Sequence, residues 1–171
     1  MVFGGKYSHN TWWTDEPRQI KGINLLPITT ASLYLGRAPH HVKRSVATLG
    51  PETALYAARG KYANPPDIWQ DIFAKYLALA DPSQGLASWK RWGSFELGDT
   101  RSHALHWLYS LNNMGTPDFS VTANTIFYSV FKDATGRKTY LAFNSGKADL
   151  KVQFSDGKSM IVQPGMLLRE N

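Results

Sequence analysis

The spacing of apolar residues predicts helices in the first two thirds of the chain. In the segment 65–82, apolar residues recur at every fourth position and their neighbours widen the same face: Ile68, Ile72, Tyr76 and Ala80, with Trp69, Phe73 and Leu77. This spacing places side chains on one side of an α-helix. The segment begins with prolines and an aspartate and ends with Asp-Pro, which are typical helix ends. We therefore predict an amphipathic helix here.

Further helices are expected on either side of this one. The segment 81–92 predicts a shorter helix capped near Ser83. The segment 98–115 predicts a third helix, which begins at Asp99 or Thr100 and ends at Gly115. Its core stripe consists of Ala104, Leu108 and Leu111, with Trp107 beside it. Segments 38–49 and 52–59 carry a weaker helical pattern.

After about residue 116 the pattern becomes that of strands. Segment 121–144 contains two runs of β-branched and aromatic residues joined by a turn at 133–137, which indicates a hairpin. Segment 150–164 resembles a second hairpin around Asp156-Gly157. Helices followed by strands, without alternation, favour an α+β fold with a helical part at 1–115 and a strand part at 116–171.

Composition sets the broad class. The chain has 171 residues, of which 43% are hydrophobic and 19% charged, as in globular domains. No apolar run approaches the roughly 20 residues of a membrane-spanning helix. Met1 is followed by Val-Phe-Gly-Gly rather than by a charged and then apolar run, so no signal peptide is expected in this chain. The absence of cysteine excludes disulfides and thiol catalysis, but it does not exclude an extracellular location.

The formal net charge of +6 raises the question of nucleic-acid binding. The densest basic group, residues 40–44, is short, and the other lysines and arginines are scattered, whereas a phosphate-binding surface concentrates them on one face. Aromatic content is more informative, because six tryptophans are many for this length. Sugar-binding sites use such rings, since the C–H faces of sugars lie flat on them. Packing in the core is the alternative for each of them.

Two kinds of catalytic or metal chemistry can be considered from the residues. His103 and His106 are three positions apart on a predicted helix, but no acidic residue follows at a spacing that would complete a metal site, and core or cleft lining is the alternative. Acid/base catalysis would need two carboxylates, for which the candidates are Asp15, Glu16, Glu96 and Asp99. Glu96 and Asp99 also fit the start of a helix, where the dipole favours acids.

Several long motifs in unbroken order resemble the endo-1,3-β-glucanases of glycoside hydrolase family 81, in their C-terminal part. The motifs are "FGGKYSHNTWW", "IKGINLLPITTASLYLG", "WQDIFAKYLALADP" and "ELGDTRSHALHWLYSLNNMGTPDFSVTANTIFYSVFKDATGRKTYLAFN". The most specific pieces include Gly4-Gly5-Lys6 with Thr11-Trp12, and Ser102-His103 with Trp107. The resemblance runs from near Met1 to about Asn144.

This resemblance implies a secreted or cell-wall hydrolase that cuts internal β-1,3-glucosidic bonds with inversion and needs no cofactor. The fold it implies is α+β: the later helices of an (α/α)6 toroid, followed by C-terminal antiparallel strands. The family's acid and base lie upstream of the position that Met1 occupies, so a missing N-terminal portion would be the partner of this chain. Lys21 stands where the family often carries histidine, which leaves the role of that position open.

In such a toroid, the loop from Gly4 to Pro17 would line the mouth of the β-1,3-glucan cleft. The expected substrate-binding residues are Lys6, Tyr7, His9, Trp12, Asp15 and His103. Polar side chains would bond ring hydroxyls and an aromatic ring would stack on a sugar. The alternatives are that this loop only braces the fold, that the chain is a non-catalytic glucan-binding module, or that it is an inactive fragment.

Overall fold

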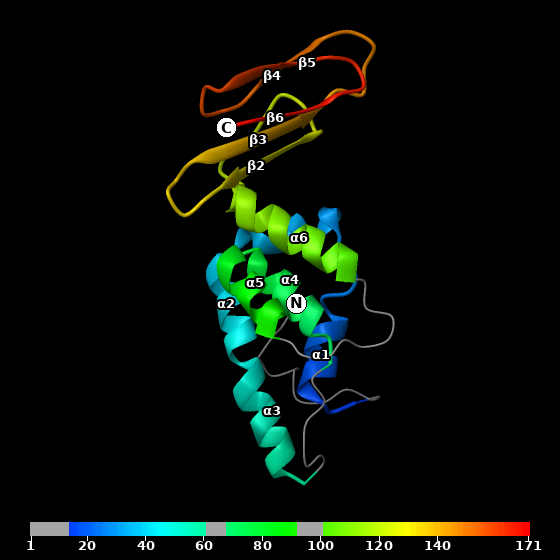
Figure 1. Ribbon diagram of the computed structural model, residues 1–171, viewed down its shortest axis with the longest axis vertical. Helices are drawn as coiled ribbons and strands as arrows, with labels where there is room; N and C mark the ends of the chain where they lie inside the picture. The colour runs from blue at the N-terminus through cyan, green and yellow to red at the C-terminus, as the bar shows by residue number, and fades with distance from the viewer. Residues whose placement is uncertain (1–13, 61–67, 92–100) are drawn as a thin grey trace. The chain divides into compact units, whose positions relative to one another are not determined.

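The computed structural model describes residues 14–60, 68–91 and 101–171 (Figure 1). The chain divides into two compact units, Met1–Asn112 and Asn113–Asn171, which are treated separately below. Described helices lie in the first unit, with the end of the last one reaching into the second, and described strands lie in the second unit. The predicted α+β class is confirmed.

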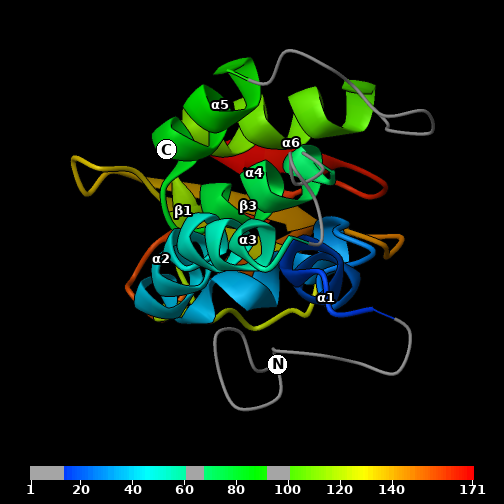
Figure 2. The same cartoon turned by 90° about the horizontal axis from the view of Figure 1, so that it is seen from below.

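Within the described residues of the first unit, there are five helices that the sequence predicted and two that it did not. The predicted ones are α2 (Pro39–Ala47), α3 (Leu49–Ala58), α4 (Gln70–Ala78), α5 (Pro82–Arg91) and α6 (Arg101–Met114). The others are α1 (Pro17–Ile23) and the 3-10 helix η1 (Thr30–Arg37). Figure 2 shows α1 next to α3, and an ion pair between the buried Lys21 and the partly exposed Glu52 joins these two helices.

Helix α4 is the most buried element of the first unit. Ile72, Phe73 and Tyr76 are buried as the spacing predicted, but the helix is shorter than the periodic segment. Ile68 and Trp69 lie outside it, because Trp69 has a left-handed backbone conformation with a φ of 57°. The apolar spacing in the sequence therefore begins before the first residue of the helix.

Helices α5 and α6 pack against α4. The cap of α5 is Asp81 rather than the expected Ser83, since the Asp81 carboxylate accepts from the backbone N–H of Gln84 at 3.1 Å. In α6 the predicted stripe is buried, and the Trp107 indole Nε1–H donates to the carbonyl of Lys75 at 3.0 Å. The helix stops before Gly115, which has a φ of 97°, as expected. The predicted start at Asp99 or Thr100 lies outside the described residues.

The second unit contains a four-stranded sheet and a two-stranded one. The first has the order β1-β2-β3-β6, formed by Thr116–Pro117, Tyr128–Lys132, Lys138–Phe143 and Leu167–Glu170. The second pairs β4 (Leu150–Gln153) with β5 (Ser159–Val162). Both predicted hairpins are present and antiparallel. A cluster of buried side chains forms the core between them: Val121, Val130, Tyr140, Ala142, Val152, Phe154, Met160 and Val162.

Two asparagines connect the hairpins of this unit. Asn124 lies in a segment that the sequence predicted as strand. Its side chain instead accepts from the N–H of Gln153 at 2.9 Å and donates to the carbonyl of Lys151 at 3.2 Å. The buried Asn144 donates to the carbonyls of Ala148 and Val162 at 2.8 and 2.7 Å. Side-chain bonds therefore replace part of the expected backbone pairing.

Candidate functional site

The candidate site begins at the N-terminus of α1. Glu16 is fully buried and caps this helix, since its carboxylate oxygens accept from the N–H groups of Arg18 and Gln19 at 3.0 and 2.7 Å. These bonds satisfy donors that a helix start leaves without intrahelical partners. Asp15 accepts from the hydroxyl of Tyr56 on α3 at 2.9 Å. Glu16 therefore has a capping role and is not a candidate for acid/base catalysis.

A buried ion pair lies along one side of α4. Asp71 and Lys75 are four residues apart, both side chains are only 4% exposed, and their charged atoms are 3.0 Å apart. The second carboxylate oxygen of Asp71, Oδ1, is buried without a hydrogen-bond partner. Buried polar atoms rarely stay unbonded in native proteins, so this oxygen is a ready acceptor for a further donor.

His103 of α6 lies near this pair. Its ring packs at a tilt on Trp107, with 6.4 Å between ring centroids. The pKa of His103 is lowered from the usual 6.5, first by burial and then by the charges of Lys75 and His106, while Asp71 acts in the opposite direction. At neutral pH the imidazole is therefore mostly neutral and has one donor and one acceptor nitrogen.

The structure thus adds Asp71 and Lys75 to the candidate site residues. The sequence analysis missed both of them. An aspartate and a lysine four residues apart on an otherwise apolar face were the available signal. Of the expected substrate-binding residues, Asp15 accepts from Tyr56 of α3, whereas His103 belongs to α6 and packs on a tryptophan of the same helix, so these contacts do not bring the two together. Lys6, Tyr7, His9 and Trp12 lie outside the described residues.

Lys21 is buried and contacts residues of α3. Its side chain is 2% exposed and its ammonium group donates to the Thr48 hydroxyl at 2.7 Å and pairs with Glu52 at 2.5 Å. Both partners sit at the start of α3. Lys21 therefore connects α1 to α3. This contact gives a structural role to position 21, whose role the sequence left open.

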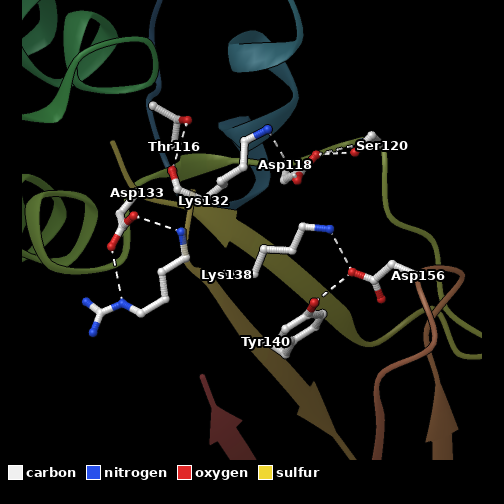
Figure 3. Close-up of polar contacts among 9 residues, drawn as sticks. Thr116, Asp118, Ser120, Lys132, Asp133, Lys138, Tyr140 and Asp156 are labelled. Atoms are coloured by element: carbon white, nitrogen blue, oxygen red, sulfur yellow. Dashed lines mark hydrogen bonds and ion pairs between the residues drawn. The ribbon is translucent and has the colours of Figure 1, made fainter. Parts of the chain in front are cut away.

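A second polar cluster lies in the strand unit (Figure 3). One carboxylate oxygen of Asp156 accepts from the Lys138 ammonium and from the Tyr140 hydroxyl, each at 2.7 Å. These bonds, the one from Lys138 first, lower the pKa of Asp156, while burial and the same aspartate raise the pKa of Tyr140 to about 12. Asp156 therefore stays ionised, whereas a general acid needs a raised pKa.

The other carboxylates of Figure 3 close turns. Asp133 accepts from the Thr135 hydroxyl at 2.7 Å and from the backbone N–H groups of Thr135 and Arg137, which lowers its pKa. Asp118 accepts from the Ser120 hydroxyl at 2.6 Å. Burial acts to raise the pKa of Asp118, but the bonds from Ser120 and the charge of Lys132 outweigh it, so the net shift is downward. This cluster is structural in character.

Neither a cluster of metal ligands nor a membrane-spanning helix is found in the ranges 14–60, 68–91 and 101–171. No group of three or more His, Asp or Glu residues there could hold a metal ion. Among the same residues, no helix has the length and apolar character needed to cross a bilayer.

Comparison with known proteins finds relatives that match nearly the whole chain. No family model matches the chain. It is 42% identical over 164 residues, 96% of its length, to a glucan endo-1,3-β-D-glucosidase of Acetivibrio thermocellus, and 40% identical over 170 residues to one of Thermobifida fusca. The chain is therefore similar to one portion of these glucan endo-1,3-β-D-glucosidases. It spans only about one fifth of the length of these relatives, 20% and 21%.

A solved structure agrees with this similarity. A glycoside hydrolase family 81 protein of Clostridium thermocellum, solved as a glutamate-to-alanine variant, is 38% identical and superposes with a TM-score of 0.78. The match covers 95% of this chain and 21% of that protein. The resemblance found in the sequence motifs is therefore confirmed.

Proposed function

We propose that this chain is one portion of an enzyme that hydrolyses internal β-1,3-glucosidic bonds of β-glucan outside the cell or in the cell wall. The observation that carries the proposal is the 40–42% identity, over nearly the whole chain, to relatives named glucan endo-1,3-β-D-glucosidase. The helices of the first unit would be the later helices of the (α/α)6 toroid.

In this proposal the chain binds substrate, and the catalytic acid and base come from residues outside it. Three carboxylates among the described residues already have other roles. Glu16 caps α1, Asp71 pairs with Lys75, and the bonds to Asp156 keep it ionised. An inverting glycosidase needs a protonated acid and a base on opposite sides of the bond, with roughly 6.5–9.5 Å between them. None of these three groups fits the role of the acid.

Substrate contacts are assigned to the N-terminal loop and to α6. Lys6, Tyr7, His9, Trp12 and Asp15 would meet the sugar from the loop. His103 would meet it from α6, because its neutral imidazole can donate to one hydroxyl and accept from another. A ring such as Trp12 would stack on a pyranose face.

Hydrolysis of laminarin, a soluble β-1,3-glucan, tests the proposal. We expect reducing-sugar release by the protein made with all residues that its gene encodes, and none by the 171-residue chain alone. A pull-down of the chain alone on insoluble β-1,3-glucan shows whether it binds without cutting. Activity of the chain alone, abolished by Asp15→Asn, would place a catalytic carboxylate here and contradict the proposed division of roles.

A further inference from the structure

The residue before α4 has an unusual backbone conformation. Trp69 has φ 57° and ψ 29°, and it is the only non-glycine residue with positive φ among those the structure describes. The left-handed region is unfavourable for a side chain as bulky as tryptophan. Such a conformation persists only where surrounding contacts fix it, and it concentrates at functional sites.

Arg18 of α1 fixes the residues on both sides of Trp69. Its guanidinium donates to the carbonyl of Ile68, through Nε at 2.9 Å and also through Nη2, and to the side-chain oxygen of Gln70 at 3.3 Å. The same group lies over the Phe73 ring, 4.9 Å from its centroid. Gln70 is held in turn, because its side-chain amide donates to the Ser88 hydroxyl of α5 at 2.7 Å.

Gly22 of α1 contacts the indole ring of Trp69. A Cβ at this position would lie 1.9 Å from Cε3 and 2.6 Å from Cζ3 of Trp69, so any larger residue would displace the ring. The ring therefore rests directly on the backbone of α1. Trp69 nevertheless remains partly exposed, whereas Ile72 and Phe73, just beyond it, are buried.

These contacts orient a large aromatic ring without burying it fully. A tryptophan that served only the core could join α4 in helical conformation, as the apolar period of the sequence suggested. We propose that Trp69 is a preorganised stacking platform for one glucosyl unit of the polysaccharide, with Arg18 and Gly22 as the residues that position it. This inference rests on the proposed function, which supplies the substrate class.

Substitutions at position 69 separate a platform from a structural role. In the protein made with all residues that its gene encodes, Trp69→Ala is expected to weaken binding of soluble β-1,3-glucan oligosaccharides about tenfold, because the stacking surface is lost. Trp69→Phe is expected to lose less, since a ring remains. Trp69→Gly, which removes the ring and also relieves the backbone, is expected to weaken binding as much as alanine while the unfolding temperature falls little.

Two further variants act as controls. Gly22→Ala displaces the ring without removing it, and it is expected to weaken binding while Trp69 is still present. Val42→Ala shortens a fully buried side chain of α2, away from the proposed site, and it is expected to lower the unfolding temperature but to leave oligosaccharide affinity unchanged. The proposal that Trp69 is a platform is wrong if Trp69→Ala and Trp69→Gly lower the unfolding temperature as Val42→Ala does and leave affinity unchanged.

The parent protein must be measured first on a panel of polysaccharides of different linkage. If it binds none, both the proposed function and the platform are wrong. If it binds a glucan of another linkage and not β-1,3-glucan, the proposed function is wrong, and a tenfold loss of that binding in Trp69→Ala still supports the platform. Unchanged binding of that glucan in Trp69→Ala would overturn the platform.

Discussion

At the scale of single residues, the buried pair of Asp71 and Lys75 has the largest energetic consequences. Both charges are nearly removed from water, which costs free energy that their mutual attraction offsets only while both are present. The unbonded Oδ1 of Asp71 adds a further cost. A buried ion pair with this desolvation cost is more characteristic of a functional site than of a hydrophobic core.

Lys75→Met is expected to lower the free energy of unfolding by about 3–5 kcal/mol, because it leaves Asp71 buried without its partner. The matched control is Lys43→Met, which breaks a pair with Asp81 in which the lysine side chain is half exposed. That change is expected to cost less than about 1 kcal/mol. Urea denaturation measures both, and equal losses would show that the Asp71–Lys75 pair is not energetically buried.

His103 should titrate below its usual pKa of 6.5. Since the unfolded chain takes up the proton first, this residue makes stability fall as the pH drops below 6.5, until the folded pKa is passed. Lys75→Met should raise the pKa of His103 and Asp71→Asn should lower it further, because each removes one of the charges that act on the ring. NMR titration of the imidazole measures the pKa of His103 in the parent protein and in both variants. Shifts of the opposite sign would contradict this electrostatic description.

At the scale of elements, close approach between helices depends on small residues. Gly85 of α5 faces α4, and a Cβ there would lie 2.8 Å from the Ala74 carbonyl oxygen and 2.8 Å from the Ala78 Cβ. A methyl group on Gly85 would therefore push the two helices apart. Gly50 in α3 differs, because a Cβ there would meet nothing within 4 Å.

The two glycines therefore predict opposite effects of the same substitution. Gly85→Ala is expected to lower the free energy of unfolding by about 1–3 kcal/mol through overpacking. Gly50→Ala is expected to be neutral or to raise it by up to about 1 kcal/mol, because alanine favours helix. Thermal unfolding of both variants measures this, and a neutral Gly85→Ala would mean that α4 and α5 are more loosely packed than described.

At the scale of the whole molecule, the strand unit exposes an apolar face. Ile126 is 85% exposed and Leu167 61%, and Phe127 packs edge-on against Phe143 with 6.2 Å between ring centroids. These residues surround a shallow cavity of about 280 Å³. An apolar face that gathers several large side chains is typical of a surface that another part of a protein covers, which agrees with a chain one fifth as long as its relatives.

Changing Phe127 and Leu167 together to serine is expected to reduce self-association of the 171-residue chain, because the exposed apolar area falls. In the protein made with all residues that its gene encodes, the same change is expected to lower the unfolding temperature. Sedimentation velocity measures the first effect and calorimetry the second. Unchanged association and an unchanged unfolding temperature would show that this face is not covered.

The sequence by itself determined that helices precede strands, and it located α2 to α6, the two hairpins and the stop of α6 at Gly115, but not α1 or η1. These follow from periodicity and from glycine, which act within a few residues of the chain. It also carried the family resemblance, because long motifs in fixed order are specific. Along the same lines, the stripe of Ala104, Leu108 and Leu111 could be read from spacing alone.

Only the tertiary structure decided how the candidate site is built. The left-handed Trp69 depends on Arg18 and Gly22, some fifty residues earlier in the chain, and no local pattern near Trp69 contains them. The surroundings of the buried Asp71 and Lys75 likewise include Trp107 of α6, some thirty residues later in the chain, which donates to the Lys75 carbonyl. Such contacts join distant residues through packing, and packing overrides the local preference for a longer helix because burial and side-chain bonds outweigh the backbone strain of one residue.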